Sequence, residues 1–143
     1  MPADFYKEKE HAFITIGKDI KEGNIPRLVL LCGKEDYLIR FYADMLIKKY
    51  VSDACRPIDL VTLEGDFLSL DKVKESLETV SLMSERKVVF LPEFTPAAGK
   101  AIKGFGEADV KGLIDYFKDI PEGALLLITA SEIDEAKAKK NKV

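Results

Sequence analysis

The stretch RLVLLCGKEDYLIRF, residues 27–41, predicts the fold of this chain. Residues 28–32 are all apolar and lead directly to Gly33, as expected of a strand that is buried on both faces of a parallel sheet. A helix is predicted over residues 35–51, with an apolar stripe that we expect to face the core: Leu38, Phe41, Tyr42, Met45 and Leu46. A strand, a glycine and a helix in this order are typical of a βα unit.

The remaining segments continue this alternation. Further strands are predicted over residues 58–63, 87–91 and 124–130, and further helices over residues 5–22, 70–82 and 107–119. Ser69 is a candidate N-cap for the third of the four helices, and residues 94–106, rich in Gly, Ala and Pro, predict a loop. Polar interruptions in residues 58–63 place that strand near an edge of the sheet. The order of elements predicts a three-layer α/β fold, with a parallel sheet covered by helices on both faces.

Composition indicates one ordinary globular domain. The chain has 143 residues, of which 47% are hydrophobic and 33% charged, and a net charge of -3 offers no basic surface for holding nucleic acid by itself. No apolar run approaches the roughly 18 residues that a membrane span needs, and the N-terminus is too charged for a signal peptide. We therefore expect a cytoplasmic protein with no membrane partner.

Metal and thiol chemistry have few candidate residues. The two cysteines, Cys32 and Cys55, are far apart and have no metal-ligand spacing, and the single histidine is His11. We predict no metal site. Cys32 is expected to be a small buried apolar residue, and His11, beside two glutamates, is expected to be solvated.

Gly33 stands where a phosphate-binding loop would begin. The pattern G-x-x-x-x-G-K-[ST] requires glycine, lysine and a hydroxyl at positions that Leu38, Ile39 and Arg40 occupy here. Two carboxylates also lie where a polyphosphate would bind, and like charges repel. The sequence therefore predicts a degenerate loop that binds no nucleotide cofactor, formed by Gly33, Lys34, Glu35 and Asp36.

Other catalytic patterns are missing from the sequence. Pro92 follows residues 87–91 where a metal-holding aspartate would stand, and the next residue, Glu93, is interpreted as a solvated loop carboxylate. The sequence has a single histidine to serve in any catalytic triad, and it contains no G-x-[SC]-x-G nucleophile elbow. We predict no catalytic residue. A nucleotide hydrolase or kinase with an unusual loop is the alternative from the enzyme class.

Leu82 and Met83 are adjacent apolar residues at the predicted end of the helix over residues 70–82. Neighbours on a helix point about 100° apart, so the two cannot both continue the predicted core stripe, and at least one should be exposed. That stripe consists of Leu70, Val73, Leu77 and Val80. From the spacing alone, closing the core is favoured over docking to a partner, because Leu and Met side chains are usually buried.

Three stretches resemble the N-terminal domain of the delta subunit of bacterial DNA polymerase III, a clamp-loader subunit. They are RLVLLCGKEDYLIRF (27–41), LEGDFLSLDKVKESLETVSLMSERKVVFL (63–91) and LIDYFKDIPEGALLLITASEID (113–134). In that family the first has G-x-[ED]-x-[YF]-L-I in place of a working phosphate loop, and the second carries S-L-[FM]-[SA]-x-R before a buried strand. The resemblance implies an AAA+-like fold for residues 1–143, with lid and collar domains expected beyond Val143.

The resemblance also implies a function. The family's subunit binds and opens the beta sliding clamp for loading onto primed DNA, as part of a DNA-directed DNA polymerase complex, and hydrolyses no ATP itself. Its apolar clamp-binding pair falls on Leu82 and Met83, preceded by Ser81 and followed by Ser84 and Arg86, which reverses the preference for core closure. Met stands where Phe is common; it is apolar and flexible, so docking should survive with less shape specificity.

The implied partners are the sliding clamp, the delta-prime and tau/gamma clamp-loader subunits, and primed DNA only within the full complex. An unrelated α/β interaction module is a second alternative, and it predicts no affinity for a sliding clamp.

Overall fold

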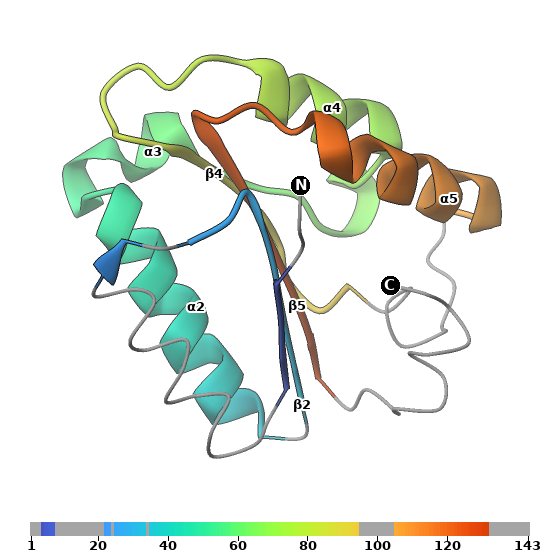
Figure 1. Ribbon diagram of the computed structural model, residues 1–143, viewed down its shortest axis with the longest axis horizontal. Helices are drawn as coiled ribbons and strands as arrows, with labels where there is room; N and C mark the ends of the chain where they lie inside the picture. The colour runs from blue at the N-terminus through green and yellow to red at the C-terminus, as the bar shows by residue number, and fades with distance from the viewer. Residues whose placement is uncertain (1–3, 8–21, 24, 34, 95–104, 132–143) are drawn as a thin grey trace.

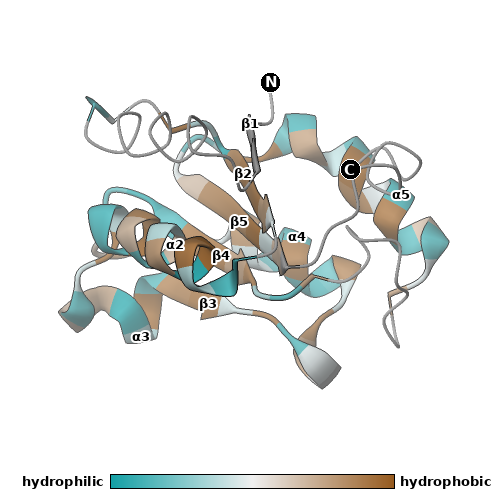
Figure 2. Cartoon of the chain, turned by 90° about the horizontal axis from the view of Figure 1, so that it is seen from below, coloured by the Kyte–Doolittle hydropathy of each residue, from teal (hydrophilic) through white to brown (hydrophobic). Residues whose placement is uncertain are grey.

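One parallel five-stranded sheet forms the centre of the molecule. The computed structural model describes residues 4–7, 22–23, 25–33, 35–94 and 105–131. The strands are β1 (Asp4–Lys7), β2 (Leu28–Gly33), β3 (Leu60–Thr62), β4 (Lys87–Leu91) and β5 (Ala124–Ser131), arranged in the order β1-β2-β5-β4-β3 (Figure 2). Each neighbouring pair is parallel. β3 lies at an edge, as its polar interruptions predicted.

Helices cover both faces of this sheet. α2 (Asp36–Tyr50) packs on one face, against β2, β4 and β5, while α4 (Leu70–Glu78) and α5 (Glu107–Tyr116) lie together on the other (Figure 1). The short α3 (Arg56–Asp59) leads into β3. The side chain of Ser69 caps α4 by accepting from the Lys72 N–H at 3.2 Å, as predicted. The three-layer α/β class is therefore confirmed.

The core has two halves because successive strand residues point to opposite faces. On β2, Leu30 and Cys32 pack toward α4 and α5, while Val29 and Leu31 pack toward α2. β5 alternates in the same way, and Figure 2 shows the central strands as mainly hydrophobic ribbons. Burial on both faces explains why these strands are uninterrupted apolar runs. Cys32 is buried, as expected.

The buried face of α2 differs from the expected one. Its fully buried residues are Ile39, Ala43, Leu46, Ile47 and Tyr50. Of the five predicted core residues, Leu46 belongs to this set, and Leu38, Tyr42 and Met45 are partly buried and pack against the same core cluster. Phe41 is the exception, since it is 48% exposed. The apolar face of this helix is wide, and packing against the sheet decides where its centre lies.

Three predicted element boundaries are wrong. Asp4–Lys7 pairs with β2 as a strand instead of beginning a helix, and residues 8–21 of that predicted helix lie outside the described part of the chain. The strand predicted from residue 58 begins at Leu60, because Ile58 and Asp59 belong to α3. The helix predicted to reach Leu82 ends at Glu78.

The predicted loop over residues 94–106 is anchored at both ends. Residues 95–104 lie outside the described part of the chain, but Phe94 and Phe105 are buried. Their rings meet edge to face, with 5.3 Å between centroids. The two flanks of this segment are therefore core residues.

Parallel strands give the sheet two different edges, and the two candidate sites lie on opposite ones. Gly33 ends β2, so the predicted phosphate loop lies at the carboxyl edge. Leu82 and Met83 precede β4, so they lie at the amino edge. Whatever each site does, the two are separated by the length of the strands.

Candidate functional site

The loop of residues 79–86 joins α4 to β4 and presents apolar side chains to solvent. The side chains of Leu82 and Met83, called here the exposed pair, are 76% and 65% exposed. Val80, expected in the core stripe of the helix, is 78% exposed because α4 has already ended. The expectation that at least one of the pair is exposed is confirmed, and core closure by the pair is wrong.

A buried carboxylate holds the backbone of the exposed pair. Asp59 Oδ1 accepts from the Leu82 N–H and Asp59 Oδ2 accepts from the Met83 N–H, both at 3.0 Å. The Asp59 side chain is only 1% exposed. Figure 1 shows the loop after α4 passing beside α3, which carries this residue. Two consecutive amides therefore point inward to one carboxylate.

Two serines close a turn around the exposed pair. Ser81 Oγ donates to the Ser84 carbonyl oxygen at 2.7 Å, and the Ser84 N–H donates to Ser81 Oγ at 3.2 Å. The Ser81 side chain thus forms hydrogen bonds with the backbone of Ser84, the residue that follows Leu82 and Met83. The structure brings together four of the predicted site residues in one compact turn.

Hydrogen bonding keeps the buried Asp59 ionised. Burial by itself opposes the charged form, but the hydrogen bonds that the carboxylate accepts, above all from the Leu82 N–H and the Met83 N–H, outweigh it and lower the pKa of Asp59 below its usual value of 3.8. Hydrogen bonds to an ionised acceptor are stronger than neutral ones. At neutral pH the loop is therefore bound by charge-assisted hydrogen bonds.

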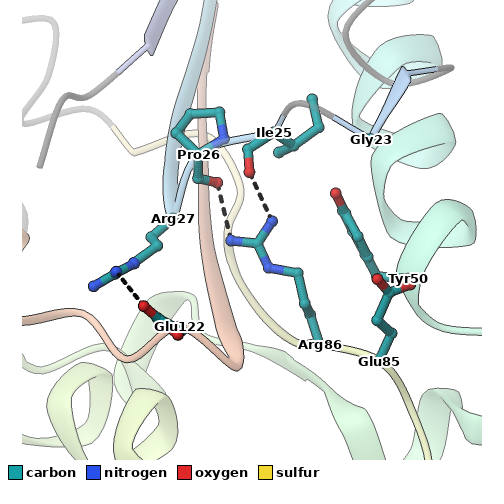
Figure 3. Close-up of a pocket in the computed structure, with 8 residues that line it drawn as sticks. All are labelled: Gly23, Ile25, Pro26, Arg27, Tyr50, Glu85, Arg86 and Glu122. Carbon is teal, nitrogen blue, oxygen red and sulfur yellow. Dashed lines mark hydrogen bonds and ion pairs between the residues drawn. The ribbon is translucent and has the colours of Figure 1, made fainter.

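Arg86 anchors the other end of the loop. Its guanidinium donates to three backbone carbonyls, those of Ile25 at 2.9 Å, Pro26 at 3.1 Å and Ala124 at 3.0 Å. Figure 3 shows the side chain reaching from the loop toward Ile25 and Pro26, with Tyr50 beside it. Arg86 is only 9% exposed. Unlike the exposed pair, this predicted site residue points into the protein.

Arg86 also borders an open hollow of about 510 Å³ at the amino edge of the sheet. Its lining residues are Gly23, Ile25, Pro26, Arg27, Tyr50, Glu85, Arg86 and Glu122 (Figure 3). The second arginine, Arg27, donates to the Ile120 carbonyl at 2.9 Å and pairs with Glu122 at 3.2 Å. Both arginines of the hollow are therefore already bonded to protein acceptors.

The predicted phosphate loop has a different character. Gly33 has a φ of +153°, which favours glycine for backbone reasons alone. Lys34 lies outside the described residues, and Glu35 immediately precedes α2. Asp36, in the first turn, pairs with Arg40 at 2.8 Å. A carboxylate at this helix end occupies the position of favourable dipole potential that a phosphate would use.

The described residues contain neither a cluster of metal-binding side chains nor a membrane-spanning helix. Within residues 4–7, 22–23, 25–33, 35–94 and 105–131, no group of three or more His, Cys, Asp or Glu side chains could hold a metal ion. In that same part of the chain, no helix has the length and apolar character needed to cross a bilayer.

Asp59 is the site residue that sequence reasoning missed. It lies in the run IDLVTL, residues 58–63, which the sequence pattern predicts to be a strand. An aspartate inside an otherwise apolar run is a usable signal, because a buried carboxylate needs bonded partners. The sequence offers no indication that those partners are the amides of residues 82 and 83.

The fold is similar to that of solved proteins that include a clamp-loader subunit. The delta protein of the Bacillus subtilis DNA clamp loader matches with a TM-score of 0.75 and 22% identity, over 91% of this chain and 40% of that one. A DNA polymerase III gamma subunit-related protein from Thermotoga maritima matches with a TM-score of 0.59 and 12% identity, over 88% of this chain and 43% of that one. At these identities the likeness shows a shared fold.

The family itself is shown by the sequence match. The family model described as DNA polymerase III, delta subunit, matches residues 29–143, so the chain belongs to this family. This confirms the resemblance noted above. No curated protein matches the chain. The chain spans only 40% and 43% of the length of the two solved proteins.

Proposed function

We propose that this chain is the part of a clamp-loader delta subunit that binds the beta sliding clamp and favours its open form during DNA replication. Membership of the delta family supports this role. The observation that carries it is the exposed pair, Leu82 and Met83, held outward on a loop whose amides are bonded to the buried Asp59. Apolar side chains fixed in this way suit insertion into a partner's pocket.

Burial of the exposed pair would supply much of the binding energy. Fully burying a Leu or Met side chain contributes about 1.5 to 3 kcal/mol, so the pair contributes roughly 3 to 6 kcal/mol before the costs of association. Val80, in the same loop, is 78% exposed, and Ile58, which precedes Asp59 in the chain, is 45% exposed. An interface centred on a few such anchors is typical of protein recognition.

The proposed mechanism is differential binding. A subunit that binds the open clamp more tightly than the closed one shifts the clamp population toward opening. This step uses no hydrolysis by this chain, in keeping with the carboxylate at the first turn of α2. The delta-prime and tau/gamma subunits are proposed as further partners, and primed DNA as a ligand of the assembled complex.

The test compares two pairs of exposed apolar residues. Leu82→Ala/Met83→Ala should reduce binding to the purified sliding clamp by at least about 100-fold in surface plasmon resonance, because about 3 kcal/mol or more is lost. Tyr37→Ala/Phe41→Ala removes two exposed aromatic side chains, 75% and 48% exposed, near the start of α2 at the opposite edge. This control should bind like the unmodified chain.

Circular dichroism establishes that both variants are folded. Equal clamp binding by the folded Leu82→Ala/Met83→Ala variant would overturn the proposal. Absence of any clamp binding by the unmodified chain would do the same.

A further inference from the structure

The carboxylate of Asp59 contacts the two residues whose side chains form the proposed docking surface. Each carboxylate oxygen accepts one backbone hydrogen bond: Oδ1 from the Leu82 N–H and Oδ2 from the Met83 N–H, each with an N···O distance of 3.0 Å. The donors lie 23 and 24 positions along the chain, so this contact is made only by the folded protein. Fixing two consecutive N–H groups restricts the backbone directions from which both side chains project.

We infer that Asp59 is the positioning residue that holds Leu82 and Met83 in their clamp-binding arrangement. The inference rests on the proposed function, because the arrangement matters only if the pair docks. Asp59 itself is 1% exposed and would not touch the partner.

The chemistry of the site requires an aspartate. Two N–H donors need two acceptors, and an ionised carboxylate offers acceptors only. An asparagine in the same place has one oxygen and one NH₂ group, so one amide would face another donor. Burial excludes water from replacing the lost hydrogen bond, and an unsatisfied buried group is costly.

Asp59 lies at the junction of α3 and β3. Asp59 ends α3, and the next residue, Leu60, pairs with Val88 in the β3–β4 ladder. At the start of α3, Arg56 donates to Asp44 of α2 at 3.2 Å. The loop is thus tied to the sheet through Asp59 near its centre and through Arg86 at its end. A docking loop ordered before binding loses less conformational freedom when the partner arrives.

The test is Asp59→Asn, which keeps the size of the side chain and removes one acceptor. Two measurements are made on this chain: affinity for the sliding clamp by surface plasmon resonance, and amide hydrogen exchange followed by NMR. We expect exchange to accelerate more at the Leu82 and Met83 amides than in β2 and β5, and clamp affinity to be weaker by about 10-fold. Asp115→Asn is the matched control, since it makes the same change at an exposed position of α5 and should alter neither measurement.

The outcomes separate this inference from the function on which it rests. If the unmodified chain binds the clamp and Asp59→Asn binds equally well, the positioning role is overturned while the proposed function stands. If the unmodified chain does not bind, the proposed function fails. A purely structural role for Asp59 would lower protection in β2 and β5 as much as at the Leu82 and Met83 amides, and this result would also overturn the inference.

A second variant avoids changing Asp59 at all. Replacing the Met83 backbone amide by an ester removes a single N–H donor and keeps the Asp59, Leu82 and Met83 side chains. The same loss of about 10-fold in clamp affinity is expected, because one of the two contacts to the carboxylate is gone. Unchanged affinity of this folded ester variant would overturn the inference.

Discussion

The guanidinium of Arg86 lies over the ring of Tyr50, with 4.9 Å between the guanidinium carbon and the ring centroid. Tyr50 is the last residue of α2, and Arg86 is the last residue before β4. The contact joins the helix on one face of the sheet to the loop that carries the exposed pair. A buried cation bonded to three carbonyls and an aromatic face has few substitutes, since lysine lacks the planar fork of donors.

Replacing Arg86 should therefore destabilise the protein. In Arg86→Met three carbonyls lose their donor, and we expect the free energy of unfolding to fall by about 3 kcal/mol. Urea denaturation followed by circular dichroism measures this change. Arg40→Met is the control: its side chain is 76% exposed, so a change within about 0.5 kcal/mol is expected. Equal stability of the two variants would contradict the anchoring role of Arg86.

Tyr116 should make stability depend on pH in the alkaline range. Burial, together with the hydrogen bond its hydroxyl donates to Glu78 Oε1 at 3.0 Å and the charges of Glu78 and Asp119, raises the pKa of Tyr116 to about 12. The raised pKa means that this stabilisation is complete below the usual pKa of 10.0 and is lost as the pH rises toward 12.

Tyr116→Phe tests this dependence. The difference in unfolding free energy between the unmodified chain and Tyr116→Phe should shrink when denaturation is measured at pH 11 instead of pH 9. A difference that stays constant over this interval would show that the hydroxyl is not held in its neutral form by the fold.

Asp59 should make stability depend on pH in the acid range, with the opposite sign. Its pKa is lowered, so the stabilisation from the ionised carboxylate is present above 3.8 and is lost as the pH falls through the lowered value. The stability advantage of the unmodified chain over Asp59→Asn should be full at pH 6 and should decrease below pH 3.8. Urea denaturation across this range measures it, and an advantage that grows on acidification would contradict the assignment.

Nucleotide affinity should be very weak. The carboxylate of Asp36 stands in the first turn of α2 and pairs with Arg40, so a polyphosphate would meet a negative charge at the helix end. Titration with MgATP in a calorimeter should give no saturable binding below about 1 mM, a dissociation constant that corresponds to only about 4 kcal/mol. A micromolar dissociation constant would restore the nucleotide hydrolase or kinase as the better reading of this domain.

Prediction from sequence succeeded where the governing interaction is local or general. The strands β2, β4 and β5 follow from short apolar runs, because a strand buried on both faces requires nearly every residue to be apolar. The N-cap at Ser69 likewise depends on a residue three positions away. Neither feature needs knowledge of the rest of the chain.

Prediction was wrong where distant residues decide. The helix over residues 70–82 continues its apolar spacing past Glu78, but the structure ends it there, and the following backbone bonds to Asp59 instead. The buried face of α2 is a similar case. Phe41 and Ile39 both fit the apolar spacing of an amphipathic helix. The way in which α2 packs on the sheet buries Ile39 and leaves Phe41 exposed.

By itself the sequence determined a parallel α/β domain of the delta family, with an adjacent Leu82 and Met83 of which at least one had to be exposed. The fold class and the exposure depend on periodicity and composition, which act over neighbouring residues, whereas the family depends on the resemblance of three stretches of the sequence. Only the tertiary structure decided that both side chains are exposed, that Arg86 points inward, and that Asp59 holds the loop. A hydrogen bond spanning 23 residues exists only after the sheet has brought its partners together, and no local pattern encodes it.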